Sequence, residues 1–189
     1  MKKITVIGLG TLLNISTLFG ANYKVDETHS AIEFKVRHMM VSYTKGNFDK
    51  FNGTFEYNPK TKSLSKVNGN VFTNSINTKD AKRDEHLLAM DFLDSKKYPK
   101  MHIELIEQNG DKAMFNLTIK NITKKVEFNL NELSQEIKDP WGTRRRGFTL
   151  SATINRKDFG LTFNKVLDTG GLAVADEVKI NLEIEGIAI

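Results

Sequence analysis

Apolar and polar side chains alternate with a period of two along most of this chain. From Ile32 to His38, every second residue is apolar or aromatic except the final histidine, and charged residues fill the positions between them. This alternation is typical of a β-strand with one face buried. Further segments repeat it between short turn signals, so we expect about eight strands. Their predicted inward positions are Ile32, Phe34, Val36 and His38; Phe51, Gly53, Phe55 and Tyr57; Val67, Gly69 and Val71; Ile103 and Leu105; Phe115, Leu117 and Ile119; Val126, Phe128 and Leu130; Phe148, Leu150, Ala152 and Ile154; and Val178, Ile180, Leu182 and Ile184.

One stretch departs from this alternation. Residues 78–94 mix apolar, acidic and basic side chains, with Asn77 or Thr78 as a candidate N-cap and Pro99 beyond the end. We therefore predict one or two short helices within 78–94, lying across an end or a side of the sheet. The other connections are short, as in hairpins, so the strands should pair antiparallel in an all-β sandwich or barrel. A barrel of about eight strands can either fill its lumen with side chains or leave room for one small ligand.

The N-terminus has the pattern of a secretory signal peptide. Two lysines follow Met1, an apolar run extends over 4–19, and Gly20 and Ala21 end it. This order of cationic, apolar and small residues predicts a leader over 1–21 and one mature domain over 22–189. No later segment is apolar over the length that a bilayer requires, so we expect no stable membrane insertion.

Composition narrows the class of protein. The chain contains no cysteine, which excludes thiol catalysis, thiolate metal sites and disulfides. An exported domain without disulfides suits a bacterial periplasm. The formal net charge of +5 is spread over basic residues scattered among acids, and the run Arg144–Arg146 lies beside turn residues. This distribution does not indicate nucleic-acid binding.

Candidate chemistry is sparse. The four histidines lack the close same-face spacing of a zinc motif, and no serine lies in a nucleophile elbow. We therefore predict no catalytic residue, no metal and no cofactor. His38 has two interpretations, because a histidine on an apolar face is either a hydrogen-bonded core residue or a partner for a polar ligand head.

Motifs spread over the whole mature chain resemble the YceI-like family, whose members are described as polyisoprenoid-binding. The resemblance depends on the order and spacing of many short motifs. They are Asp26-x-x-His29-Ser30-x-Ile32-x-Phe34-x-Val36-Arg37-His38, Gly46-x-Phe48, Phe51-x-Gly53, Ser75-Ile76-Asn77-Thr78, Arg83-Asp84-x-His86-Leu87, Asp91-Phe92-Leu93-Asp94, Tyr98-Pro99, Leu117-Thr118-Ile119, Thr123-Lys124-x-Val126, Gly147-Phe148, Arg156-x-Asp158-Phe159-Gly160 and Asp176-Glu177-Val178-x-Ile180.

This resemblance implies a lipocalin-like antiparallel barrel with an internal tunnel, a periplasmic location and, in some cases, a homodimer. It also implies a long-chain hydrophobic or amphipathic small molecule as the ligand. We predict that the chain of this ligand lies among apolar residues and that its polar head meets His38, Arg83, Arg156 and Asp158. The predicted apolar contacts are Phe34, Val36, Phe48, Phe55, Met90, Phe92, Phe115, Leu117, Phe128, Phe148, Leu150 and Phe159.

Two alternatives remain open at this point. The chain could be an enzyme acting on an isoprenoid or acyl lipid, with His38 or Asp158 as the acid–base group. It could also be a stress-related structural protein whose barrel is filled by its own side chains.

Overall fold

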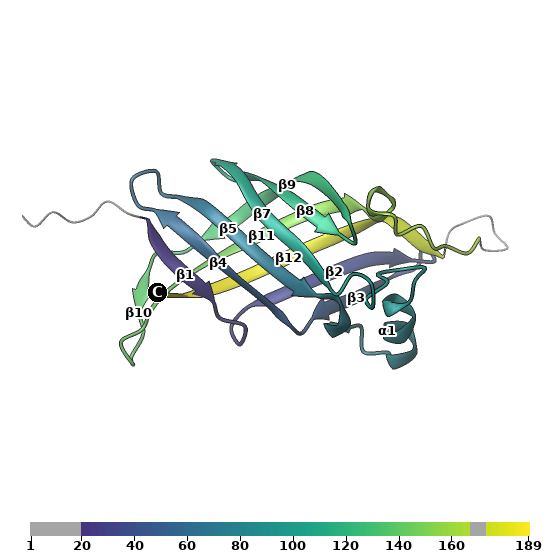
Figure 1. Cartoon of the computed structure of the whole chain (residues 1–189). Coiled ribbons are helices and arrows are strands. Elements are labelled where there is room, and N and C mark those ends of the chain that lie inside the picture. Colours follow the sequence, from purple (N-terminus) through teal and green to yellow (C-terminus); the bar gives the residue numbers. More distant parts are fainter. Residues whose placement is uncertain (1–19, 167–172) are drawn as a thin grey trace, which may run out of the picture.

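The computed structural model describes residues 20–166 and 173–189. The predicted leader over 1–21 therefore lies almost wholly outside the described residues. The rest of the chain is built mainly of strands (Figure 1). The strands are β1 Ala21–Val25, β2 Ala31–His38, β3 Ser42–Phe48, β4 Phe51–Asn58, β5 Ser63–Phe72, β6 Ile76–Asn77, β7 Lys100–Asn109, β8 Lys112–Ile119, β9 Ile122–Leu133, β10 Ile137–Lys138, β11 Arg144–Asn155 and β12 Val174–Ala188; the helices are η1 Thr73–Ser75, α1 Ala81–Leu88 and η2 Arg156–Phe159.

Within the described residues, eight strands close into an antiparallel barrel. Their pairing follows the order β1, β4, β5, β7, β8, β9, β11 and β12, and β12 returns to β1. The long strand β12 pairs with β11 along one edge, from Glu177 to Ile187. Its other edge pairs first with β2 and then with β1. The prediction of an antiparallel barrel of about eight strands is confirmed.

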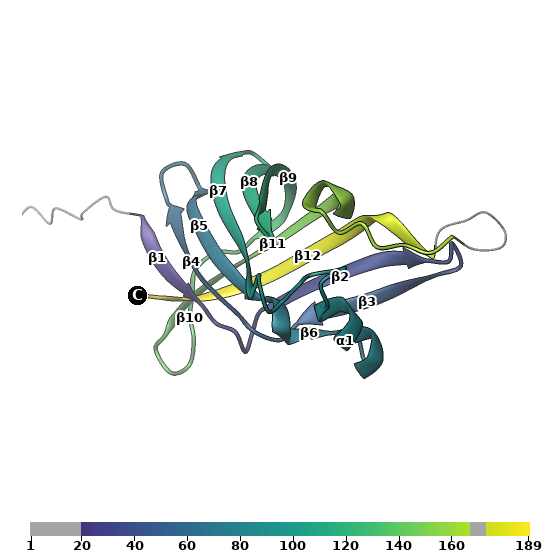
Figure 2. The same cartoon turned by 45° about the vertical axis from the view of Figure 1, so that its right-hand side comes forward.

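The hairpin of β2 and β3 extends one side of this barrel (Figures 1 and 2). Sequence periodicity did not indicate β3, because its inward positions include Thr44 and Gly46 and only Phe48 is large and apolar. Gly46 lies directly opposite Phe34. A Cβ at Gly46 would stand 2.5 Å from the Phe34 ring, so this glycine lets the ring lie flat over β3.

The helix α1 confirms the prediction of a short helix within 78–94, but its cap is not the predicted one. Asp80 is the N-cap, and its side chain accepts a hydrogen bond from the amide of Arg83 at 3.1 Å. Thr78 is buried instead, and its hydroxyl accepts from the Arg83 Nε at 2.7 Å. The Asp84 carboxylate accepts from the Thr78 amide at 2.9 Å. These bonds fix α1 over the end of the barrel where β2 and β3 extend.

Candidate binding cavity

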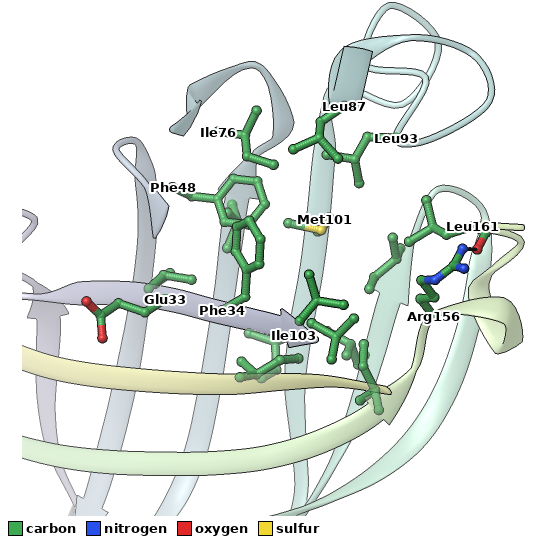
Figure 3. A pocket seen from close by; sticks show the side chains of 18 of the residues that line it. Glu33, Phe34, Phe48, Ile76, Leu87, Leu93, Met101, Ile103, Arg156 and Leu161 are labelled. Carbon is green, nitrogen blue, oxygen red and sulfur yellow. Dashed lines mark hydrogen bonds between the residues drawn. The ribbon is translucent and has the colours of Figure 1, made fainter. Parts of the chain in front are cut away.

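An apolar cavity of about 190 Å³ lies inside the barrel on the side of α1 (Figure 3). Alternation along the strands turns every second side chain of β2, β12, β7 and β8 toward it. Phe34 and Val36 come from β2, while Leu87 and Leu93 reach it from α1 and the turn that follows. Because its wall is apolar, the cavity suits a hydrocarbon group and offers little to a polar one.

A second, smaller cavity of about 40 Å³ lies deeper in the barrel. Four side chains line both cavities and so form a neck between them. They are Ile32, Val71, Ile103 and Leu182. The two cavities are therefore neighbours, separated by the four side chains of this neck.

Beyond the neck, the barrel is filled by aromatic side chains. The ring of Tyr23 stacks on Phe55 at 4.8 Å, and Phe55 meets Phe148 edge to face at 5.0 Å. Phe115 makes a further edge contact at 5.2 Å with Phe128, which also lines the main cavity. Such pairs stabilise a core beyond their buried area. This end of the lumen has no space for a long ligand.

Charged residues close the filled end from outside. Tyr23 donates to Glu136, and Arg144 donates to the same carboxylate at 2.8 and 2.9 Å. Arg146 covers the ring of Tyr57 at 3.7 Å. Burial raises the pKa of the Tyr23 phenol, and the bond from Arg144 lowers the pKa of Glu136. The basic run of the β10–β11 hairpin thus forms part of the barrel's closure.

Arg145 lies at the centre of a neighbouring ion-pair network. Its guanidinium contacts Asp26 at 2.7 Å, Asp139 at 2.8 Å and Glu185 at 2.6 Å. Asp26, His29 and Glu185 lie close enough together to suggest a cation site. However, Arg145 already supplies a positive charge to both carboxylates, so these residues do not fit a metal ion. A hydrogen bond from Thr28 and the bonds from Arg145 lower the pKa of Asp26.

At the hollow end, aromatic side chains meet over the mouth of the cavity. His86 of α1 lies 5.0 Å from Phe92 and 4.7 Å from Phe163, and these two phenylalanines lie 4.8 Å apart. His86 also pairs with Asp91 at 2.8 Å. The three rings, which we call the aromatic clasp, join the α1 segment to the loop after η2. Of these three rings, Phe92 also lines the main cavity.

The structure divides the predicted ligand-binding residues into groups. One group lines the main cavity, a second lines the smaller cavity, and a third is buried in the core without lining either. The first comprises Phe34, Val36, Phe48, Phe92, Leu117, Phe128 and Arg156; the second comprises Phe55, Phe148 and Leu150; the third comprises Phe115 and Phe159. For the first group, a role in ligand binding stays a prediction.

Met90, expected in the lumen, and Asp158, expected at the polar head, do not line the cavity. Met90 is 79% exposed, because α1 ends at Leu88 and the next residues turn outward. Asp158 is exposed on η2. Met90 therefore does not line the cavity as predicted, while contact of Asp158 with a polar head stays a prediction.

His38 and Arg83 do not line the cavity either. His38 ends β2 opposite Ser42 and Val174, and Arg83 is bonded to Thr78. His38 and Asp158, the two residues considered for acid–base chemistry, are therefore not among the residues that line the cavity.

Arg156 is the one predicted polar partner that reaches the cavity lining. It is 3% exposed and donates to the carbonyl oxygens of Leu161 and Ala175 and to the carboxylate of Asp176. Burial lowers its pKa, while Asp176 opposes that effect. Most of its N–H donors are therefore used to hold the loop after η2 against β12.

Several lining residues were not predicted from sequence. Ile76, Leu87, Leu93, Met101 and Leu161 all face the main cavity. Ile76, Leu87 and Leu93 belong to motifs of the family resemblance, so that signal was available for them. Nothing in the strand periodicity singles out Leu161, because it follows η2 in irregular chain.

Comparison with known proteins identifies the family of this chain. A family model described as a YceI-like domain matches residues 23–186. The chain belongs to the YceI-like family. Related sequences cover almost all of this YceI-like chain: a UPF0312 protein of Pseudomonas paraeruginosa is 38% identical over 98% of this chain and 97% of its own length. A UPF0312 protein of Yersinia pestis is 34% identical over 100% and 98%.

Solved structures share the fold of this YceI-like chain. BcnA of Burkholderia cenocepacia superposes with a TM-score of 0.71 at 22% identity, over 85% of this chain and 98% of its own. The Campylobacter jejuni YceI protein gives 0.66 at 26% identity, over 79% and 88%. A polyisoprenoid binding domain from Saccharophagus degradans gives 0.62 at 14% identity, over 88% and 98%. Among the described residues, no helix is long and apolar enough to cross a membrane.

Proposed function

We propose that this YceI-like protein binds and carries a long-chain amphiphile, such as a polyisoprenoid, an isoprenoid-quinone precursor or a fatty-acyl derivative, in the barrel lumen. The observation that carries this proposal is the apolar cavity of about 190 Å³ on the side of α1. A relative of the same fold is named as a polyisoprenoid binding domain, which supports a chain-like ligand. We further propose that the protein performs no chemistry on its cargo.

The energy of such binding comes from burying hydrocarbon. Each buried methylene contributes about 0.8 kcal/mol, so ten of them contribute about 8 kcal/mol before costs. The entropy lost when the ligand is immobilised and its chain is ordered offsets a large part of this favourable free energy. Micromolar binding is therefore within reach without a strong polar contact.

The size of the cavity limits how the cargo is held. At about 190 Å³, it is smaller than the roughly 300–1,000 Å³ of typical pockets for drug-sized ligands. A long chain thus needs either the side chains of the neck to turn aside or its own far end to remain near the aromatic clasp. The head group then lies at the mouth, where water and the α1 segment can meet its polar atoms.

A carrier of this kind can move a water-insoluble lipid through an aqueous compartment. The leader predicted over 1–21 directs the chain out of the cytoplasm, and we propose the periplasm as its location. There the barrel would store, shield or ferry its cargo.

Uptake of a long polyprenol by the purified mature chain tests the proposal. We expect a one-to-one complex that co-elutes on gel filtration and is identified by mass spectrometry. Val178→Phe places a ring in the main cavity and should reduce uptake more than about tenfold, since several methylenes lose their place. Glu177→Phe adds the same ring at an exposed position of the same strand and should leave uptake unchanged. Equal uptake by both variants, or none by the unmodified protein, contradicts the proposal.

A further inference from the structure

The tip of the β2–β3 hairpin exposes apolar side chains to water. Met39, Met40 and Val41 are 44%, 62% and 81% exposed. Turn positions usually carry small polar residues, yet Met39 and Met40 adopt positive φ values of 47° and 58° here. We call residues 39–41 the hairpin tip. The amide of Met39 donates to the carbonyl of Ala173 at 2.9 Å, which ties the hairpin tip to the chain entering β12.

A row of lysines crosses the outer face of the sheet behind the hairpin tip. Lys179 of β12 lies directly opposite Lys35 of β2, and Lys35 lies opposite Lys45 of β3. We call these three residues the lysine row. All three are exposed, and none forms an ion pair with another residue in 20–166 or 173–189. Like charges placed directly opposite each other on a sheet are destabilising, so a row of this kind favours an anionic partner.

The lysine row lies in a concave surface. This outer groove has a volume of about 510 Å³ and is lined by the three lysines together with polar side chains such as Asn129, Asn181 and Thr153. Glu33 is the acidic residue among its lining. Because three positive charges face one negative charge, the groove attracts anions.

The spacing between the hairpin tip and the lysine row matches the layers of a bilayer. Lys35 precedes Met39 by four residues, which is about 13 Å along a strand. Between them, Arg37 lies over the Tyr43 ring at 5.0 Å, and both side chains suit the polar–apolar boundary. With the hairpin tip among acyl chains, the basic residues therefore reach the level of the head groups.

We propose that the hairpin tip and the lysine row together dock the hollow end of the barrel on a lipid bilayer carrying anionic head groups. An apolar surface and a basic surface meet at this end. The acyl chains of a bilayer can accept the apolar hairpin tip, and its anionic head groups can pair with the lysine row. The hairpin tip lies at the same end of the barrel as α1 (Figure 1). Leu87 of α1 lines the cavity, and His86 of α1 belongs to the aromatic clasp. Use of this docked state to exchange cargo rests on the proposed function, whereas docking itself does not.

Vesicle flotation with the mature, unloaded protein tests docking. We expect binding to vesicles of phosphatidylethanolamine and phosphatidylglycerol at least about tenfold above binding to pure phosphatidylcholine, and weaker binding as salt is raised. Met40→Asn with Val41→Asp removes the apolar tip and should weaken binding about tenfold or more. Lys35→Glu with Lys45→Glu should do the same, because each basic residue near an anionic surface contributes about fivefold.

Two matched controls lie at the filled end of the barrel. Ile137→Asp changes an apolar residue that is 61% exposed on β10, and Lys24→Glu with Lys60→Glu reverses two exposed lysines. Both should bind vesicles like the unmodified protein. An absence of vesicle binding overturns the proposal, and so does an equal loss in the control variants, which would indicate attraction by net charge alone.

Polyprenol uptake in solution separates the two proposals. Variants of the hairpin tip and the lysine row should take up polyprenol normally, since neither group lines the lumen. Vesicle binding without any uptake would leave docking in place and contradict the proposed function. Uptake of polyprenol without vesicle binding would leave the proposed function in place and contradict docking.

Discussion

The two ends of the barrel are built from the same alternating strands, yet one end is filled and the other is hollow. At the filled end, Tyr23 stacks on Phe55 and Phe55 meets Phe148 edge to face, and β1, β4, β11 and β12 pair around these rings. At the hollow end, the inward residues of β2 and β12 face those of β7 and β8 across a cavity. The comparison shows that closure of the sheet, and not the residue pattern alone, decides whether a lumen holds space.

Strand pairing explains the difference. β9 pairs with β11 only from Asn129 to Leu133, so its first half separates from β11 at the hollow end. There η2, the loop after it and the α1 segment cover the opening in place of a strand. Arg156 donates to the main-chain oxygens of Leu161, Val174 and Ala175, which holds that loop against β12.

The largest expected effect distinguishes core from cavity wall. Phe55→Ala removes a ring that is 1% exposed, and it should lower the free energy of unfolding by about 3–5 kcal/mol. Phe34→Ala removes the same ring from the cavity wall and should cost clearly less, because that ring already borders empty space. Urea denaturation of both variants measures the difference. Equal losses would mean that the hollow end is as tightly packed as the filled one.

A substitution at the neck tests whether its side chains limit the length of the bound chain. Ile103→Ala should join the two cavities and shift preference toward longer chains, by about fourfold for each further methylene admitted. Leu117→Ala enlarges the main cavity away from the neck and serves as the control. Competition between acyl chains of different length measures the preference. If the control variant shifts it equally, the neck does not set the limit.

Acid should weaken the filled end first. Arg145 lowers the pKa of Asp139, and Thr28 together with Arg145 lowers that of Asp26, from an ordinary value of 3.8. A carboxyl whose pKa falls on folding stabilises the folded state above its unfolded pKa, and this stabilisation is lost as the pH drops. The thermal midpoint should therefore fall below about pH 4, and less steeply in Arg145→Gln. An unchanged slope in that variant would show that other carboxyls dominate.

The smallest expected effect concerns the aromatic clasp. Phe163→Ala removes two aromatic contacts at the mouth, so cargo should dissociate about two- to tenfold faster while capacity stays the same. Stopped-flow transfer of a fluorescent fatty acid to vesicles measures the rate. Tyr98→Ala, whose ring lies near Lys97 away from the clasp, is the control. A slower or unchanged release from Phe163→Ala contradicts a gating role.

Much of the fold could be predicted from alternation, because inward positions such as Phe128 and Leu150 are large and apolar. Alternation did not predict β3, because its inward position 46 is a glycine. This glycine leaves room for the Phe34 ring opposite it and has no apolar side chain of its own. The N-cap was misplaced for a similar reason: Thr78 and Asp80 are both good caps, and only the packing of Arg83 decides between them.

The site was harder to predict than the fold. Both ends of the lumen show the same period, so the sequence could not separate Phe55, which fills the barrel, from Phe34, which borders the cavity. Local sequence also could not show that Arg156 holds the loop after η2 while Asp158 is exposed, because both depend on how that loop packs on β12. Closure of the sheet depends on pairing between distant strands, which local patterns do not contain.

Native mass spectrometry of the protein purified from its own cells, followed by denaturing extraction and lipid analysis, tests the central claim most directly. A hollow end that carries cargo predicts one long-chain amphiphile per protein molecule, lost in Val178→Phe and kept in Glu177→Phe. A clean unliganded mass, with no uptake of added polyprenol or fatty acid, would contradict the carrier function and leave a barrel whose role lies on its surface.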